Sequence, residues 1–222
     1  MLEQIKAVIF DLDGTLVDSM WMWEEIDIEF LSARDIPMPP TLKYDIEGIS
    51  FAQTAEYFAR TFALEETPEE LMEIWNQMAY DKYCHEVPLK PGAKEFLDYL
   101  KEQGIKVGIG TSNSHQLTKA ALEAHGIMED IDCLLTSNEV PNGKPEPDIY
   151  LKTAERLGVQ PQECLVFEDI PNGMLAAKAA GMKVCAVEDE FSVELRERKR
   201  ALADYYITSF AEITEGTYEE LC

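Results

Sequence analysis

Two aspartates, Asp11 and Asp13, come directly after an apolar run at residues 5–10. Gly14 and Thr15 then interrupt the run, so the two acids stand where a buried strand would end. Open α/β sheets present their reactive groups at the carboxyl ends of their strands. Two carboxylates this close repel each other, and burying them without a partner is costly. A divalent cation relieves both problems, and an oxygen-only site suits Mg²⁺.

Further polar residues follow apolar runs or lie in the loops after them: Thr111, Ser112 and Asn113, then Lys144, then Glu168 and Asp169. Because the carboxyl ends of parallel strands meet at one edge of a sheet, we expect these side chains to converge with the two aspartates. Such a set suits phosphoryl transfer. One carboxylate attacks phosphorus, a second moves protons, and hydroxyl, N–H and ammonium groups hold the phosphate oxygens. Taken singly, each residue is more often a solvated turn or a helix cap, so the prediction depends on their joint placement.

The elements that would position these residues alternate between strand and helix patterns. Strands are expected at residues 6–10, 105–109, 132–135, 164–167, 183–187 and 205–207, and helical patterns separate most of them. This alternation predicts the α/β class, with a mostly parallel sheet covered by helices on both faces.

The segment between residues 18 and 84 contains no strand-like run. It shows helical patterns after residue 18 and again at 41–46, 51–62 and 68–83, with a proline-rich break near residue 38. The segment is too long for a crossover loop. It therefore predicts an inserted helical cap at residues 18–84, with the catalytic core formed by residues 1–17 and 85–222.

Composition limits the partners. The 222 residues include 43 acidic and 19 basic ones, for a formal net charge of −24 at pH 7. This charge argues against nucleic acid and anionic membranes as partners, and it means that a phosphate site must create its own positive potential. The five cysteines form no paired motif, and no apolar stretch reaches the length of a membrane span. We expect a cytoplasmic protein that binds a small phosphorylated metabolite, as a monomer, with a dimer left open.

Four segments resemble the ordered motifs of the haloacid dehalogenase superfamily: Asp11-Leu12-Asp13-Gly14-Thr15, Thr111-Ser112-Asn113, Lys144-Pro145, and Glu168-Asp169 with Gly173. The resemblance covers nearly the whole chain and is strongest to the β-phosphoglucomutase-like subgroup. It implies a Rossmann-like core with an all-α cap of four helices inserted after the first motif.

The resemblance also implies roles for individual residues. Asp11 would be the nucleophile and Asp13 the general acid/base. The phosphate would be bound by Thr111, Ser112, Asn113 and Lys144. Mg²⁺ would be held by Asp11, the backbone carbonyl of Asp13, Asp169, and Glu168 directly or through water.

The cap bears on the choice between phosphatase and mutase. Residues 45–51 look like the cap segment with which mutases of this subgroup bind a second phosphate. In those mutases a lysine and an arginine flank the glycine of this segment, whereas here Glu47 and Phe51 flank Gly48. A carboxylate and a phenyl ring cannot clamp a phosphate dianion. We therefore predict a Mg²⁺-dependent phosphatase of small phosphomonoesters, namely sugar or polyol phosphates, that works through an aspartyl-phosphate.

Two alternatives stay open: a phosphosugar mutase of the β-phosphoglucomutase type, and a non-catalytic member that binds a ligand. The candidate substrate and cap residues are Thr15, Trp21, Glu47, Gly48 and Ser50. Four side chains near the start of the cap could form a wall over the substrate: Met20, Trp21, Met22 and Trp23. Packing within the cap is expected for at least two of these four.

Overall fold

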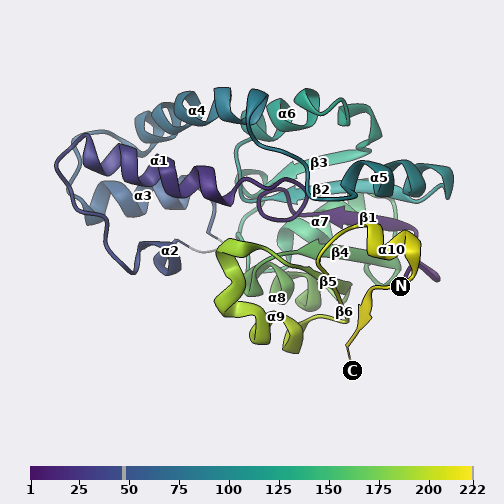
Figure 1. The fold of residues 1–222 in the computed structure, drawn as a ribbon. Helices are drawn as coiled ribbons and strands as arrows, with labels where there is room; N and C mark the ends of the chain where they lie inside the picture. The colour runs from purple at the N-terminus through teal and green to yellow at the C-terminus, as the bar shows by residue number, and fades with distance from the viewer. Residues whose placement is uncertain (47–48, 222) are drawn as a thin grey trace.

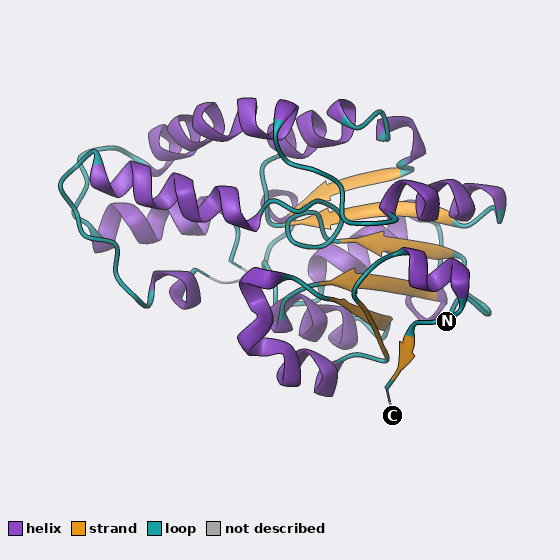
Figure 2. Ribbon diagram, viewed as in Figure 1, coloured by secondary structure: helices purple, strands orange, loops and turns teal. Residues whose placement is uncertain are grey.

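The computed structural model describes residues 1–46 and 49–221. Within these residues the chain forms one seven-stranded sheet in the order β3-β2-β1-β4-β5-β6-β7 (Figure 2). The strands are β1 (Ala7–Phe10), β2 (Lys106–Thr111), β3 (Cys133–Thr136), β4 (Cys164–Glu168), β5 (Lys183–Val187), β6 (Tyr205–Ile207) and β7 (Glu219–Glu220). Strands β1 to β6 are parallel, and β7 pairs antiparallel with β6. The predicted α/β class with a mostly parallel sheet is confirmed.

Strand β1 lies at the centre of the parallel part of the sheet. Val8 is paired with Val107 on one side and with Leu165 on the other. All four residues of β1 are buried, as a strand covered on both faces requires. The strand order reverses at β1, because β2 and β3 lie on one side and β4 to β6 on the other. The crevice of an open α/β sheet forms at the carboxyl end of such a reversal, and Asp11 follows at that end.

Helices cover both faces of the sheet (Figure 1). The described part of the core contains α5 (Ala93–Glu102), α6 (His115–Ala124), α7 (Asp148–Leu157), α8 (Pro171–Ala179), α9 (Arg196–Leu202) and α10 (Ala211–Glu215), with 3₁₀ turns η1 (Met128–Asp130), η2 (Ser137–Glu139), η3 (Pro161–Glu163) and η4 (Glu190–Leu195). On one face, the rings of Phe10, Phe96, Phe167 and Phe210 meet with centroids 5.2–6.1 Å apart. On the other face, Ile9 and Val166 pack with Tyr150 and Met174. None of the described helices is long and apolar enough to cross a membrane.

Between residues 18 and 84 every described element of secondary structure is a helix, as predicted. This part of the chain contains α1 (Met20–Ser32), the single turn α2 (Leu42–Asp45), α3 (Phe51–Thr61) and α4 (Pro68–His85), which extend to the left of the sheet in Figure 1. The rings of Phe30, Phe58 and Trp75 pack edge to face within the cap, and they belong to the same buried apolar cluster as Phe10 of the sheet. Helix α4 also packs against α6 of the sheet domain. The domain limits at 17/18 and 84/85 stay a prediction.

The two linkers between the cap and the sheet domain pair with each other. Val17 and Leu89 form an antiparallel bridge, and the N–H of Asp18 donates to the carbonyl of Pro88 at 2.9 Å. The two ends of the cap therefore leave the sheet domain side by side.

One lysine joins this pair of linkers to the loop after β5. The Lys90 ammonium lies 3.1 Å from the Asp18 carboxylate and 2.6 Å from the Asp189 carboxylate. The Asp189 side chain is fully buried and the Lys90 side chain is 10% exposed, so solvent screens their attraction weakly.

Candidate active site

Residues from all four predicted motifs line one cavity of about 290 Å³ at the carboxyl edge of the sheet. The predicted residues on its wall are Asp11, Asp13, Thr111, Ser112, Asn113, Lys144 and Asp169. Asp11 and Asp13 come after β1, Thr111 ends β2, and Asp169 follows β4. Parallel pairing of β1 with both β2 and β4 brings these positions together. The predicted convergence of these side chains is thus present in the structure.

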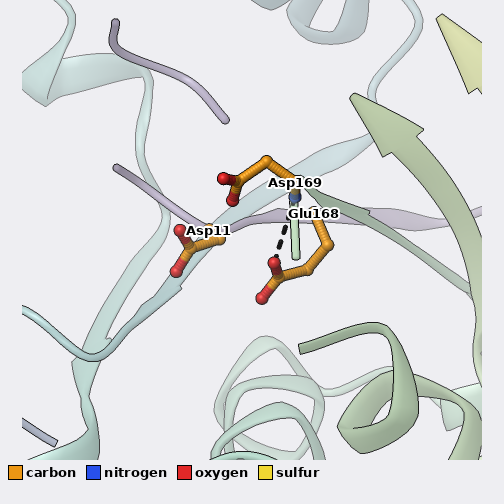
Figure 3. Close-up of side chains that lie close together, drawn as sticks. All are labelled: Asp11, Glu168 and Asp169. Carbon is orange, nitrogen blue, oxygen red and sulfur yellow. Dashed lines mark hydrogen bonds between the residues drawn. The ribbon is translucent and has the colours of Figure 1, made fainter. Parts of the chain in front are cut away.

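Three buried carboxylates form a cluster at this edge. Asp11, Glu168 and Asp169 each offer an oxygen atom within 4.8 Å of the others. Figure 3 shows these side chains together, with the backbone N–H of Asp169 donating to the carboxylate of Glu168 at 3.1 Å. Burial, partly offset by the charge of Lys144, raises the pKa of Asp11 to about 7. Burial and the charge of Glu168 raise the pKa of Asp169 well above its usual value. Buried, crowded carboxylate oxygens are the donor set that fits a hard divalent cation.

Lys144 supplies the positive charge that the acidic chain must provide locally. Its ammonium donates to Asp11 Oδ1 at 2.6 Å and to Glu168 Oε1 at 2.5 Å. Burial lowers the pKa of Lys144, but the charges of Asp11 and Glu168 outweigh that effect and the pKa lies above its usual value. The Tyr150 hydroxyl donates to the same Glu168 oxygen at 2.7 Å. Lys144 therefore stays cationic on the wall of the cavity.

Two glycines make room for the carboxylates. A Cβ atom on Gly173 would lie 1.7 Å from Glu168 Oε1. Gly14 has a φ of +73°, and its Cβ would lie 2.4 Å from Asp169 Oδ2. Both positions require glycine because a carboxylate occupies the space of a side chain.

Thr15 does not lie on the described cavity wall, where we expected it. It is fully buried, and its hydroxyl donates to Asp169 Oδ1 at 3.0 Å. Its hydroxyl therefore supports Asp169, which does line the cavity.

Asp13 has a separate set of partners, and part of that set comes from the cap. Ser19 Oγ donates to its Oδ1 at 2.5 Å, and Asn113 Nδ2 donates to its Oδ2 at 2.8 Å. The Tyr83 hydroxyl, on α4, also donates to Oδ1, and Trp23 Nε1, on α1, lies 3.4 Å from the same atom. Sequence reasoning missed Tyr83, since the tyrosine is separated from Asp13 by 70 positions and belongs to no motif.

The residues after β2 form the remaining wall of the phosphate end. Thr111 Oγ1 accepts a hydrogen bond from the N–H of Asn113 at 3.0 Å. Ser112 contacts the cap, because its carbonyl accepts from the N–H of Phe51 at 3.1 Å. Two cavity-lining residues carry a buried polar atom without a partner among the described residues: Ser112 Oγ and Trp75 Nε1. Buried polar atoms usually have partners, so both atoms are exceptions among the described residues.

The cap side of the cavity is mainly apolar. Its wall includes Met20, Trp23, Met38, Ile46, Ile49, Phe51 and Trp75. Of the four side chains considered for a wall, Met20 and Trp23 line the cavity, whereas Met22 is fully buried within the apolar core. Trp21 is not on the described wall, because its indole donates to the Asp18 carbonyl at 2.9 Å.

Ser50, one of the remaining cap candidates, does not contribute to the described wall. Ser50 caps α3, since its Oγ accepts from the N–H of Gln53 at 3.2 Å. Glu47 and Gly48 lie outside the described residues, so their predicted roles stay predictions.

Charged side chains on the cap wall are mostly acidic. Glu24 and Asp27 line the cavity, and burial together with the charge of Glu24 raises the pKa of Asp27 to about 7. Among the described residues, Lys43 is the one basic cap residue on the wall. Its ammonium is already bound by Glu194 and by the carbonyl of Phe191. A second phosphate at this end would therefore meet carboxylates and no free cation.

Comparison with known proteins agrees with this geometry. Residues 8–187 match the model of the haloacid dehalogenase-like hydrolase family. The chain is 30% identical to hexitol phosphatase B of Escherichia coli strain K12 over 218 residues, 95% of each protein. It is 33% identical to β-phosphoglucomutase of Bacillus subtilis over 190 residues, 80% of this chain and 81% of the other. The fold is shared with CbbY of Rhodobacter sphaeroides, with a TM-score of 0.81 over 94% of this chain and 96% of the other at 24% identity.

Proposed function

The chain belongs to the haloacid dehalogenase-like hydrolases, and from this we propose that it is a Mg²⁺-dependent phosphatase of a sugar or polyol phosphate. Because the chain belongs to this family and its relatives include named phosphatases, it is a phosphoric monoester hydrolase. The main support for the proposed substrate class and reaction is that Asp11, Lys144 and Asp13 line one cavity. A nucleophile, a phosphate-binding cation and a proton donor are thus available to one bound ester.

The proposed reaction has two steps. An oxygen of Asp11 attacks phosphorus, the bond from phosphorus to the leaving oxygen breaks, and that oxygen takes the proton of Asp13. Water then attacks the phosphorus of the aspartyl-phosphate and gives a proton to Asp13, while the bond from phosphorus to Asp11 breaks. The sum is hydrolysis of the ester to an alcohol and phosphate. Lys144 and Thr111 hold the phosphate oxygens on which charge accumulates.

The buried carboxylates fit a resident Mg²⁺ ion. Asp11, Glu168 and Asp169 would hold it, together with the backbone carbonyl of Asp13. When bound, the ion supplies positive charge that offsets the repulsion between the nucleophile and the phosphate.

The cap wall supports hydrolysis over phosphosugar transfer. A mutase must bind a second phosphate at the cap end, where Phe51, Glu24 and Asp27 line the cavity and Lys43 is already paired. A phenyl ring and two carboxylates do not attract a phosphate dianion. Hydroxyl groups of a sugar or polyol are better partners for the same surfaces.

The test is phosphate release from a panel of hexose, hexitol and pentose phosphates, with Mg²⁺ and with EDTA, by the parent and by Asp11→Asn. We expect Mg²⁺-dependent release that is absent in the variant. Efficient isomerisation of hexose phosphates by the parent, with little phosphate release, would support the mutase instead. No turnover of any kind by the folded parent would favour the ligand-binding alternative.

A further inference from the structure

The hydroxyl group of Tyr83 lies between the cap and the residue proposed to move protons. Tyr83 is fully buried near the end of α4, and its hydroxyl donates to Asp13 Oδ1. The same hydroxyl oxygen accepts from Asn113 Nδ2 at 2.8 Å and from Trp23 Nε1 at 3.0 Å. One hydroxyl thus connects two cap helices to residues after β1 and β2.

The amide of Asn113 closes this network. Its Oδ1 accepts from the N–H of Ser114 at 2.6 Å, which turns its Nδ2 toward the other residues. The Nδ2 group then donates to both Asp13 Oδ2 and the Tyr83 oxygen, at 2.8 Å each. The Asp13 carboxylate is therefore held at one oxygen from the sheet domain and at the other largely from the cap.

We propose that Tyr83 is a positioning residue for proton transfer by Asp13, because its hydroxyl, carried on α4 of the cap, holds one oxygen of that acid. This inference rests on the proposed function, because it takes Asp13 as the general acid. In each hydrogen bond to Asp13, the partner donates and a carboxylate oxygen of Asp13 accepts. Asp13 is such a carboxylate after it has given its proton to the leaving oxygen. These donors stabilise that carboxylate and hold it at the cavity.

Contacts between α4 and the sheet domain hold Tyr83 in place. Helix α4 packs along α6, and Ser114 Oγ at the start of α6 donates to Asn76 Oδ1 on α4 at 2.8 Å. The Tyr83 ring packs edge to face with Trp23, with centroids 6.2 Å apart. The ring thus fills the cap interior, while the hydroxyl alone reaches Asp13.

Tyr83→Phe separates the packing of the ring from the hydrogen bonds of the hydroxyl, because it keeps the ring and removes the hydroxyl. Tyr80→Phe is the matched control, since Tyr80 lies one turn earlier on α4 and is exposed. The readout is kcat/KM, which covers the steps up to departure of the leaving group. It is measured for p-nitrophenyl phosphate, whose leaving group departs without a proton, and for a hexitol 6-phosphate, whose alkoxide leaving group needs one.

We expect Tyr83→Phe to lower kcat/KM for the hexitol phosphate by roughly 10-fold or more, and for p-nitrophenyl phosphate by less than about 3-fold. Asp13→Asn is expected to show the same contrast more strongly, and Tyr80→Phe to match the parent. Trp23→Phe loses an N–H donor to the same network. It should also lower kcat/KM for the hexitol phosphate more than kcat/KM for p-nitrophenyl phosphate. It provides the test if Tyr83→Phe does not fold.

An equal decrease for the two substrates, or no decrease, would overturn the inference and leave the proposed function intact. A parent that releases phosphate from neither substrate would overturn both.

Discussion

The ammonium of Lys144 lies 2.6 Å from the carboxylate of Asp11, although the two residues are 133 positions apart. The contact is almost completely buried, and Glu168 shares the same ammonium. It gives a chain with a large negative charge one stable positive centre at the proposed phosphate site. Removing this cation therefore tests both the chemistry and the packing of the site.

We expect Lys144→Met to lower kcat by about 10²–10³-fold, the usual cost of losing one transition-state donor. It should also lower the free energy of unfolding at pH 7 by about 3–5 kcal/mol, because two buried carboxylates lose their cation. Phosphate release and urea unfolding measure the two effects. Lys101→Met is the control, since the Lys101 side chain is 65% exposed and its partner Asp130 keeps Lys94 as a second cation. Equal unfolding free energies for the two variants would contradict the prediction.

Asp27 should make the stability of the protein depend on pH. Burial raises its pKa from 3.8 to about 7 in the folded state. Between these values the unfolded chain binds fewer protons than the folded one, so the contribution of Asp27 to stability falls as pH rises and is constant above about pH 7. Asp27→Asn should therefore stabilise the protein by a few kcal/mol at pH 8 and by little at pH 4. Urea unfolding at both pH values measures this difference, and a pH-independent effect of the substitution would count against it.

Binding of Mg²⁺ should stabilise the fold as well as permit turnover. An ion that binds only the folded state contributes about 2.7 kcal/mol at 100 times its dissociation constant. We expect the melting temperature to rise with Mg²⁺ and to fall back with EDTA. In Asp169→Asn the rise should be largely lost. A parent Tm that does not change with Mg²⁺ would show that the acidic cluster does not hold this ion.

Gly173→Ala should displace Glu168, because the new Cβ would overlap its carboxylate. The expected result is a 10–100-fold weaker Mg²⁺ affinity, measured by calorimetry in the absence of substrate. Unchanged affinity would mean that Glu168 can move without affecting the ion.

Loss of the ammonium at the linkers should destabilise the protein. Lys90→Met leaves the buried carboxylate of Asp189 without its cation, at a cost of about 3–5 kcal/mol. Asp18→Asn removes the partly exposed ion pair between Lys90 and Asp18. It should lower the free energy of unfolding by about 1 kcal/mol or less. Urea unfolding of both variants gives the comparison, and a Lys90→Met protein as stable as Asp18→Asn would refute the assignment.

Much of the sheet could be predicted because its strands are short apolar runs bounded by glycine, proline or acids. The strands at 183–187 and 205–207 match the prediction to the residue, whereas β2 continues to Thr111, two residues further than expected. Strand β7 was missed because Glu219 and Glu220 carry no apolar pattern, and their pairing with β6 depends on tertiary structure.

Some residues of the candidate site could be predicted from the sequence, and others could not. Asp11, Lys144 and Asp169 stand at strand ends or in a loop between strands, and the rule for parallel sheets is enough to bring them together. Tyr83 and Lys90 could not be found in this way, because their partners come from elements whose packing no local pattern specifies. Thr15 illustrates the converse, since its place in the first motif was visible in the sequence but its contact with Asp169 was not.

The paired linkers have an evolutionary consequence. Because Val17 and Leu89 lie side by side, everything between them is a module with adjacent ends, inserted between two strands of an otherwise continuous sheet. Another module with similarly close ends could take its place without altering the strand order, if it also supplied hydrogen-bond donors to Asp13. Exchange of this one segment of chain would then give the same chemistry a new range of substrates.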